Sequence, residues 1–342
     1  MIKFFRKIRY KLMTTGKTSK YFKYAIGEIV LVVIGILIAI QINNWNEKRK
    51  ASAYNKTLLK QVHKELAFNI EKANKLIEFY RGKDTLIYKI IMKNVTYDDY
   101  KTNRIYSSVL FASMEVNLAN DDYLNFMDNQ NHSNQDQESI ILKLKELYRT
   151  DKNEVDNFDD ITLTRFVEFA ERRKLNPWYY NYAVLKETTD EMISYLLNDI
   201  YYLNEIVLYQ NRNLGDHFNY TRVFRNKAKE VYAELSDYLA IEKDTSIVKN
   251  VKDYEHYTGT YIREGTENKF VIGDRNNKLY FTIKDKTETT ILDEYIFYPD
   301  SKTDFTGPGH AFGKLRYNKD NEVVGFIRTN VNRTRYEYRK IK

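Results

Sequence analysis

One apolar stretch, residues 24–42 (YAIGEIVLVVIGILIAIQI), constrains the fold of this chain more than any other segment. Within it, residues 29–40 are all apolar or glycine. Nineteen residues in an α-helix rise about 28 Å, which matches a bilayer hydrocarbon core of about 30 Å. The sequence therefore predicts a single transmembrane helix over residues 24–42.

The charges around this stretch predict its orientation. Eight Lys and Arg residues precede it, and no acidic residue occurs before Glu28. The formal net charge of +8 comes from residues 1–23, because the remainder holds 47 basic and 47 acidic residues. The positive-inside rule then places residues 1–23 in the cytoplasm, against anionic lipid headgroups, with the rest across the membrane. Because residues 24–342 carry equal numbers of basic and acidic residues, the sequence also argues against nucleic-acid binding, which needs a basic face on a folded domain.

A cleaved signal peptide is the alternative to an uncleaved anchor, because it has the same basic and apolar regions. It also requires a small-x-small pattern before the cleavage point. Ala39 is small, but Leu37 two residues earlier is large. We therefore expect the helix to remain as an anchor.

Three residues of this helix are candidates for pairing with another membrane helix: Glu28, Gly35 and Ala39. Gly35 and Ala39 form a small-xxx-small pair that permits close approach, so the chain is a candidate homo-oligomer. Glu28 lies one turn inside the cytoplasmic end, where a carboxylate can pair with a partner or carry a proton. We expect it instead to snorkel or to pair locally with Lys20 or Lys23.

The first 50 residues resemble a large family of uncharacterised single-pass membrane proteins of gram-negative bacteria. The resemblance rests on the runs YAIGEIVLVVIGILIA and QINNWNE, since hydrophobicity alone does not require Gly27-Glu28, Gly35 or the polar residues 41–46. It implies a protein of the bacterial inner membrane with a periplasmic body. It implies no activity.

The distribution of glycine and the absence of cysteine limit the structures that the rest of the chain can form. Between residues 43 and 253 only Gly82 and Gly215 occur, whereas seven glycines follow residue 254. Few breakers suit long helices, and frequent glycines suit many turns. The sequence thus predicts a helical domain over residues 43–245 and a β-domain over residues 254–342. The absence of cysteine excludes disulfides and thiolate metal sites.

Apolar residues that recur every three and four positions predict the helices of the first domain. A helix over residues 46–80 continues out of the membrane and ends at Gly82. One further long helix restarts after Pro177 and reaches Gly215. The other expected helices cover residues 104–127, 135–148, 155–175 and 220–239. Short connections between such helices predict an antiparallel bundle.

The helical domain offers few residues with the spacing that catalysis or metal binding requires. His63 and Glu65 lack a second histidine for a metal motif. His132 lies in a polar loop, which we interpret as a solvated connector. Asp159-Asp160 is a poor carboxylate pair, since adjacent helical residues do not face each other. The aromatic run of residues 178–182 can stack a sugar ring, but packing at a helix start explains it better. We expect no catalytic residue, metal or cofactor.

Residues 254–342 consist of short β-prone runs between polar turns, which predict a small antiparallel barrel or meander. They resemble the lipocalin-like β-domain that follows β-lactamase-type serine hydrolases. Six residues carry the resemblance: Tyr257, Gly259, Tyr261, Pro299, Ser301 and Phe305. It implies a fold and a binding or docking role. A barrel of eight strands is just wide enough for side chains to fill, so we expect Tyr and Phe in its interior rather than a small ligand.

This β-domain departs from its hydrolase relatives in two ways. No hydrolase domain precedes it, and the chain contains no Gly-x-Ser-x-Gly motif. The one Ser-x-x-Lys, Ser246 to Lys249, lies in a polar stretch with no Lys-Thr-Gly after it. The turn after Asp320 also carries Asn-Glu where that family usually has a glycine.

The sequence as a whole predicts an α+β protein that acts by interaction rather than catalysis. We expect a membrane-anchored periplasmic scaffold whose β-domain docks an envelope protein or ligand. The alternative is a membrane sensor or regulatory subunit that pairs through its transmembrane helix. An enzyme is the least favoured class, because the expected His, Asp and Ser constellations are absent from the sequence pattern.

Overall fold

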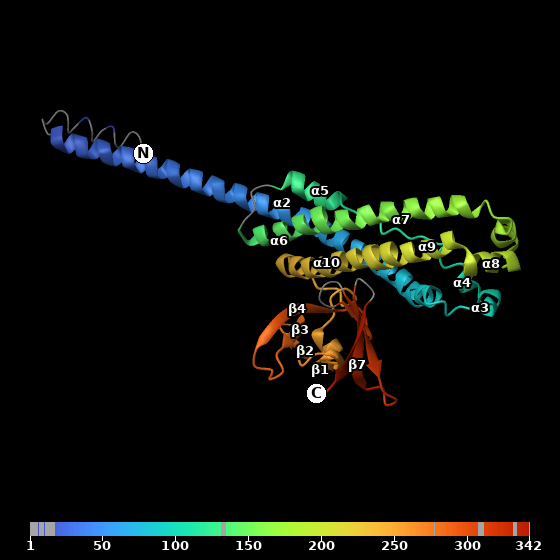
Figure 1. Cartoon of the computed structure of the whole chain (residues 1–342). Helices are drawn as coiled ribbons and strands as arrows, with labels where there is room; N and C mark the ends of the chain where they lie inside the picture. The colour runs from blue at the N-terminus through green and yellow to red at the C-terminus, as the bar shows by residue number, and fades with distance from the viewer. Residues whose placement is uncertain are drawn as a thin grey trace.

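The computed structural model describes Arg6, Tyr10 and residues 18–130, 135–276, 278–306, 311–330 and 334–341. A long N-terminal helix leads into a helical domain, and eight antiparallel strands close into a C-terminal barrel (Figure 1). The predicted α+β class and the small antiparallel barrel are therefore confirmed.

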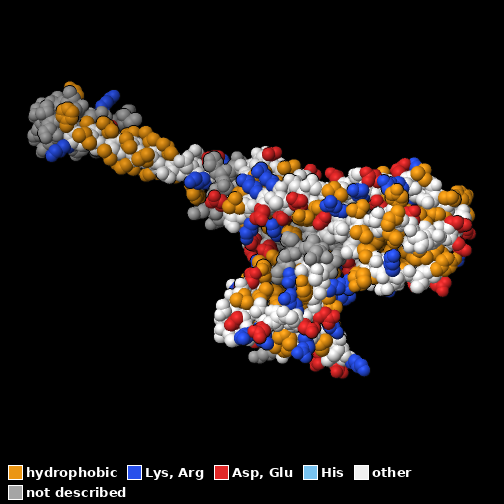
Figure 2. Space-filling view, in the orientation of Figure 1, with side chains coloured by type: hydrophobic (Ala, Val, Ile, Leu, Met, Phe, Trp, Pro, Cys, Tyr) orange, Lys and Arg blue, Asp and Glu red, His pale blue; other side chains and the backbone are white. Residues whose placement is uncertain are grey.

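One helix, α2 (Thr18–Ile91), runs unbroken from the apolar stretch into the helical domain. Its 74 residues span about 110 Å at about 1.5 Å per residue. The apolar side chains from Ile26 to Ile42 are exposed, and this part projects away from the body as an apolar rod (Figure 2). In the described part of the chain, it is the one stretch long and apolar enough to cross a membrane.

The prediction that Gly82 ends this helix is wrong. Glycine inside a helix costs about 1 kcal/mol relative to alanine. The neighbouring Tyr80, Ile87 and Ile90 are buried, and burial of each such side chain contributes about 1.5–3 kcal/mol. Packing therefore outweighs the glycine, and the helix ends at Ile91, shortly before Lys93 takes a left-handed φ of 54°.

The predicted helix over residues 104–127 is also wrong. Two short helices, α3 (Tyr97–Thr102) and α4 (Arg104–Ser107), precede residues 112–120, which have no regular secondary structure. The next helix, α5 (Asp121–Asn129), then begins. Side chains of distant helices bind the backbone of residues 116–123, so this segment does not need helical hydrogen bonds.

Two π-helical turns join shorter helices into long ones. The first, η1 (Leu147–Asp151), links α6 (Gln135–Glu146) to α7 (Lys152–Arg173). The second, η3 (Gln210–His217), links α9 (Ile200–Tyr209) to α10 (Phe218–Leu239). Gly215 therefore does not end a helix, as the sequence had predicted, because the chain remains helical through it.

The long helix expected after Pro177 is broken into pieces. It comprises a π turn, η2 (Asn181–Leu185), then α8 (Asp190–Asn198) and α9. Lys186 takes a left-handed φ of 64°, which ends η2. Asp199 is extended, and its side chain accepts the backbone N–H of Tyr202 at 3.0 Å, which caps the start of α9.

The core of the helical domain forms where α10 packs antiparallel to α2. At one end, His63 Nε2 lies 2.8 Å from Ser236 Oγ. At the other, Tyr80 Oη lies 2.8 Å from His217 Nδ1. The second half of α2 is thus a core helix of the folded domain, while the apolar side chains of its first half are exposed.

A short 3₁₀ helix, η4 (Val251–Tyr257), leads into the barrel. Each strand pairs with the next, and β1 also pairs with β8, so the sheet closes. The strands are β1 (Gly259–Arg263), β2 (Lys269–Arg275), β3 (Lys278–Lys284), β4 (Ile291–Pro299), β5 (Asp304–Thr306), β6 (Phe312–Tyr317), β7 (Val323–Thr329) and β8 (Arg335–Lys340).

Aromatic and aliphatic side chains fill the barrel, as its size predicts. Phe326 stacks on Tyr338 with ring centroids 4.3 Å apart, and Phe305 meets Phe326 edge-on at 5.2 Å. The residues of this core are no more than 4% exposed: Tyr257, Tyr261, Phe270, Ile272, Leu279, Phe281, Phe297, Phe305, Leu315, Phe326 and Tyr338.

Candidate functional site at the helix–barrel junction

The tyrosines of the predicted β-domain motif hold one end of the barrel together. The buried Tyr257 hydroxyl donates to the backbone carbonyls of Ser301 and Asp304, each at 3.0 Å. Tyr261 donates to the carbonyl of Tyr257 at 2.6 Å. Burial raises the pKa of both phenols, so they remain neutral donors. These contacts fix the start of β1 to the turn between β4 and β5.

The other motif residues shape that turn. Pro299 ends β4 and pairs with Phe305 of β5. The Ser301 hydroxyl accepts the backbone N–H groups of Thr303 at 3.1 Å and Asp304 at 3.0 Å. Gly259 has a φ of 143°, which favours glycine over any residue with a side chain. The structure thus gives the motif an architectural role, and the turn it builds carries Asp300.

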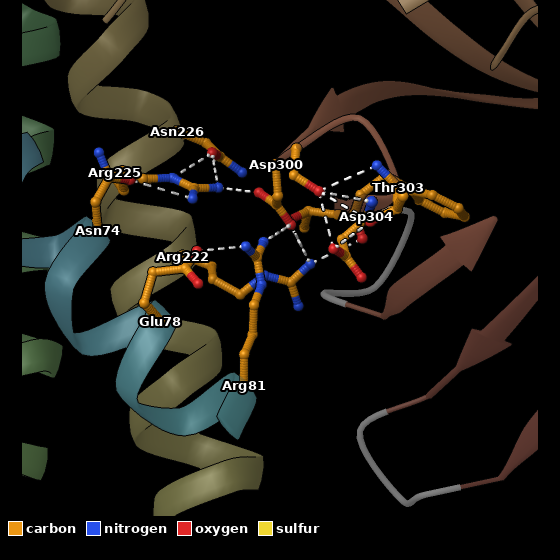
Figure 3. Close-up of polar contacts among 12 residues, drawn as sticks. Asn74, Glu78, Arg81, Arg222, Arg225, Asn226, Asp300, Thr303 and Asp304 are labelled. Atoms are coloured by element: carbon orange, nitrogen blue, oxygen red, sulfur yellow. Dashed lines mark hydrogen bonds and ion pairs between the residues drawn. The ribbon is translucent and has the colours of Figure 1, made fainter. Parts of the chain in front are cut away.

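Asp300 is the centre of a buried ion cluster between the barrel and two helices (Figure 3). Arg222 of α10 donates to Asp300 Oδ2 at 2.9 Å, and Arg225 of α10 donates to Oδ1. Arg81 of α2 lies 3.8 Å from Oδ2. Asp300, Arg222 and Arg225 are each no more than 2% exposed. The cluster therefore joins the barrel to both α2 and α10.

Further hydrogen bonds serve the arginines that Asp300 alone cannot neutralise, although the buried Nε–H of Arg222 has no partner among the described residues. Arg222 also donates to the carbonyl of Phe305 at 2.9 Å and to Thr306 Oγ1 at 2.5 Å. Arg225 donates through Nη2 to Asn226 Oδ1 at 2.7 Å, and Arg81 binds Glu78 at 2.5 Å. Such partners offset part of the cost of removing guanidinium groups from water.

The charges of the cluster determine the protonation of Asp300. Burial alone would raise its pKa, but the positive charges of Arg225, Arg222 and Arg81 hold it well below its usual value. Burial lowers the pKa of Arg222, yet a guanidinium stays protonated at neutral pH. The junction therefore carries more positive than negative charge.

A cavity of about 420 Å³ lies beside this junction. Helix α10 forms one wall, residues 247–251 a second, and the ends of β3 and β4 a third. Glu230 on the α10 wall accepts the Tyr298 hydroxyl at 2.5 Å and lies 3.2 Å from Lys278. Small-molecule sites often occur at domain interfaces of this kind.

The membrane-helix candidates lie far from this junction. Gly35 and Ala39 are exposed on the bare part of α2, and Glu28 is half-buried there. A Cβ added at Gly35 would meet no atom within 4 Å, so its surface is open to another helix. These residues therefore do not contribute to the junction.

A second buried polar cluster in the helical domain was missed from the sequence. His217 Nε2 lies 2.9 Å from Asp159 Oδ1, and its Nδ1 faces the Tyr80 hydroxyl. Asp159 also accepts the backbone N–H groups of Val116 at 2.8 Å and Asn117 at 3.0 Å. All three side chains are buried, so this arrangement ties α2, α7 and residues 116–117 together rather than meeting a substrate.

The remaining sequence candidates have packing roles. His63 stacks on Tyr232 with centroids 4.1 Å apart, and Glu65 binds backbone N–H groups. Trp178 and Tyr182 are buried, which agrees with packing at residues 178–182. His132 lies outside the described residues. Within the described ranges, His, Asp and Glu side chains form no group of three placed to hold a metal ion.

Only one weak signal in the sequence pointed to the junction. Arg222 and Arg225 are three residues apart, so they share a face of the last helix with its apolar residues. Buried arginines need partners, which predicts an acidic group nearby. Their partner lies 75 or more positions away, and the sequence alone does not identify it.

A family model described as a family of unknown function (DUF6090) matches residues 28–125. The match covers α2 from Glu28, the segment of residues 112–120 and the start of α5. It agrees with the predicted resemblance of the N-terminal part to an uncharacterised family and carries no function with it. No curated protein and no solved structure matches the chain. The likeness of the barrel to lipocalin-like domains therefore stays a prediction.

Proposed function

We propose that this chain is a membrane-anchored interaction protein of the bacterial inner membrane. In this proposal, residues 24–42 span the bilayer, residues 1–23 lie in the cytoplasm and the remainder is periplasmic. The bare apolar surface of α2 supports the anchor, because exposed apolar patches of this size mark membrane or protein contacts. The eight basic residues before it support the orientation.

The observation that carries the proposal is the continuity of α2. About 60 Å of unbroken helix separates Ile42 from Arg81, which reaches the buried Asp300 of the barrel. The anchor, the helical domain and the barrel are thus mechanically connected through one helix. A continuous helical connection of this kind suits a scaffold that holds its barrel at a fixed distance from the membrane.

The barrel would act through its outer surface, because side chains fill its interior. Ile291 and Leu292 are adjacent apolar residues on β4, and both are more than half exposed. Leu292 is the extra residue of a β-bulge, since Ile291 pairs with Lys284 and Asp293 pairs with Ile283. We place a docking contact for an envelope protein at this bulge.

Photo-crosslinking in cells tests the docking role. A photoreactive residue replaces Leu292, and in a separate chain Ile291, on β4 of the barrel. The control replaces Leu142 of α6, which is 60% exposed. We expect the barrel positions to capture a discrete envelope protein that the α6 position does not capture. Identical products from all positions, or none from the two β4 positions, would contradict a barrel docking role.

Cysteine labelling tests the topology, because the chain contains no cysteine of its own. We expect Lys48→Cys to react with an impermeant maleimide in spheroplasts, and Thr15→Cys to react only after lysis. Labelling of Thr15→Cys in intact spheroplasts would show that the chain has the opposite orientation.

A sensor or regulatory subunit is the second candidate, and the same unbroken helix supports it. A rigid helix can transmit a change in membrane-helix pairing to the junction. Gly35→Leu would block close approach at Gly35 and Ala39, and Glu28→Gln would remove the carboxylate. Impaired function of either variant with normal membrane insertion favours this role. Normal behaviour of both variants leaves the scaffold as the favoured role.

A further inference from the structure

The cavity beside the Asp300 cluster has an unbalanced set of charges. Its three acidic groups each have a cation: Glu230 binds Lys278 at 3.2 Å, Asp237 binds Lys243 at 2.7 Å, and Glu234 binds Lys143 of α6. Two lysines on its walls, Lys229 and Lys249, have no carboxylate at ion-pair distance among the described residues. The cavity therefore presents uncompensated positive charge.

The position of Lys229 makes its protonated, positively charged form unfavourable. It lies one turn after Arg225 on α10. Asp300 attracts the Lys229 ammonium, whereas Arg225, Lys249 and Arg81 repel it. Burial, reinforced by these charges, lowers the pKa of the Lys229 ammonium to about 8. A half-buried ammonium gains most from an anion that enters the cavity and accepts its hydrogen bonds.

The remaining walls are largely apolar. Ile247, Val248 and Val251 come from the connection between the domains, and Ala233 and Ile296 from α10 and β4. The volume of about 420 Å³ lies within the range of small-molecule sites, about 300–1,000 Å³. A ligand that matches these walls has one anionic group and an apolar part.

We propose that this cavity binds a small organic anion, whose charged group faces Lys229 and Lys249 and whose apolar part lies against Ile247, Val248 and Val251. The site is built from both domains and the segment between them, so a bound anion would stabilise their contact. This proposal does not depend on whether the barrel docks a partner protein.

Competitive lysine labelling tests the site on the full chain in nanodiscs of zwitterionic lipid. The probes are 3-phenylpropionate and its uncharged analogue 3-phenylpropanamide, and mass spectrometry measures reductive methylation at each lysine. We expect the carboxylate, but not the amide, to slow methylation of Lys229. Lys286 on the β3–β4 connection is the internal control, because it is 67% exposed and pairs with Glu267.

Matched variants separate the effect of the Lys229 charge on binding from any effect of the substitution on folding. With protection of Lys249 as the measure of binding, Lys229→Gln should weaken binding of 3-phenylpropionate about tenfold or more, the loss of one charge-assisted hydrogen bond, and Lys229→Arg should retain it. Lys286→Gln should leave binding unchanged. Equal protection by the amide would show a purely apolar pocket, and absence of protection at saturating carboxylate would show no site. Either result overturns the proposal.

Discussion

Arg222 on α10 donates to the Asp300 carboxylate of the barrel at 2.9 Å, and neither side chain is more than 2% exposed. This contact lies between two separate hydrophobic cores, one in the helical domain and one in the barrel. A polar cluster rather than a shared apolar core therefore connects them. Across the same junction, the rings of Phe218 and Phe312 meet edge-on with centroids 6.5 Å apart, so this contact and the polar cluster together orient the barrel on the helical domain.

Asp300→Asn should loosen the junction strongly. The substitution preserves shape but leaves Arg222 and Arg225 buried without their carboxylate, and breaking a buried ion pair costs about 3–5 kcal/mol. We expect a lower unfolding free energy in denaturant titration and faster proteolysis between residues 240 and 257. Asp320→Asn, in an exposed turn, is the control. Equal stability of the two variants would show that the cluster does not hold the domains together.

The same carboxylate should make stability depend on pH. Its pKa in the folded state lies well below the value of about 3.9 in the unfolded chain. The unfolded state therefore binds a proton in acid while the folded state does not. This contribution is complete above about pH 5 and decreases as the pH falls, by at most about 1.4 kcal/mol per unit.

Comparison with Asp300→Asn isolates this contribution from other carboxylates. The advantage of the unsubstituted chain should be largest near pH 7 and should shrink between about pH 5 and pH 2. Urea titrations at several pH values measure it. A difference that stays constant across this range would mean that Asp300 does not titrate as described.

Glu65 and Asn69 should hold residues 116–123 in place. Glu65 accepts the N–H of Asp122 at 2.8 Å and the hydroxyl of Tyr148 at 2.7 Å. Asn69 both donates to and accepts from the backbone of Ala119. Asn69→Leu leaves the two half-buried backbone groups of Ala119 without this partner, at up to about 1–3 kcal/mol each.

Hydrogen exchange of residues 112–123 measures this effect. Asn69→Leu should speed exchange there while the barrel stays protected. Glu71→Gln is the control, since Glu71 is 64% exposed and pairs with Lys75 at the surface. Unchanged exchange in Asn69→Leu would mean that other contacts hold this segment.

The sequence predicted those features that depend on local periodicity and composition. The apolar run of residues 24–42 and the β-prone runs after residue 254 were recognisable because a helix and a barrel need those patterns. The turn after Asp320 is also explained locally, because Asn321 adopts a left-handed φ of 62°, which asparagine tolerates.

Long-range polar contacts were not predictable in the same way. Residues 104–127 carried a helical pattern, yet Glu65, Asn69 and Asp159 bind the backbone there and replace its helical bonds. Asp300 looked like an ordinary turn residue, because its arginines lie far away in the sequence. A pattern of polar residues does not reveal which of them will be buried together.

Glycine at position 313 should be required by the barrel core. An added Cβ would lie 1.8 Å from Cζ of Phe305, whose ring packs against Phe297 and Phe326. Gly313→Ala must displace this ring, and overpacking of this kind costs about 1–3 kcal/mol. Because Phe305 neighbours the Asp300 turn, we expect weakened protection at residues 300–306 as well as a lower unfolding free energy. Gly273→Ala is the matched control on β2, where a Cβ meets no atom within 4 Å. If both alanine variants unfold alike, the close approach of Phe305 to Gly313 does not limit the packing of the barrel.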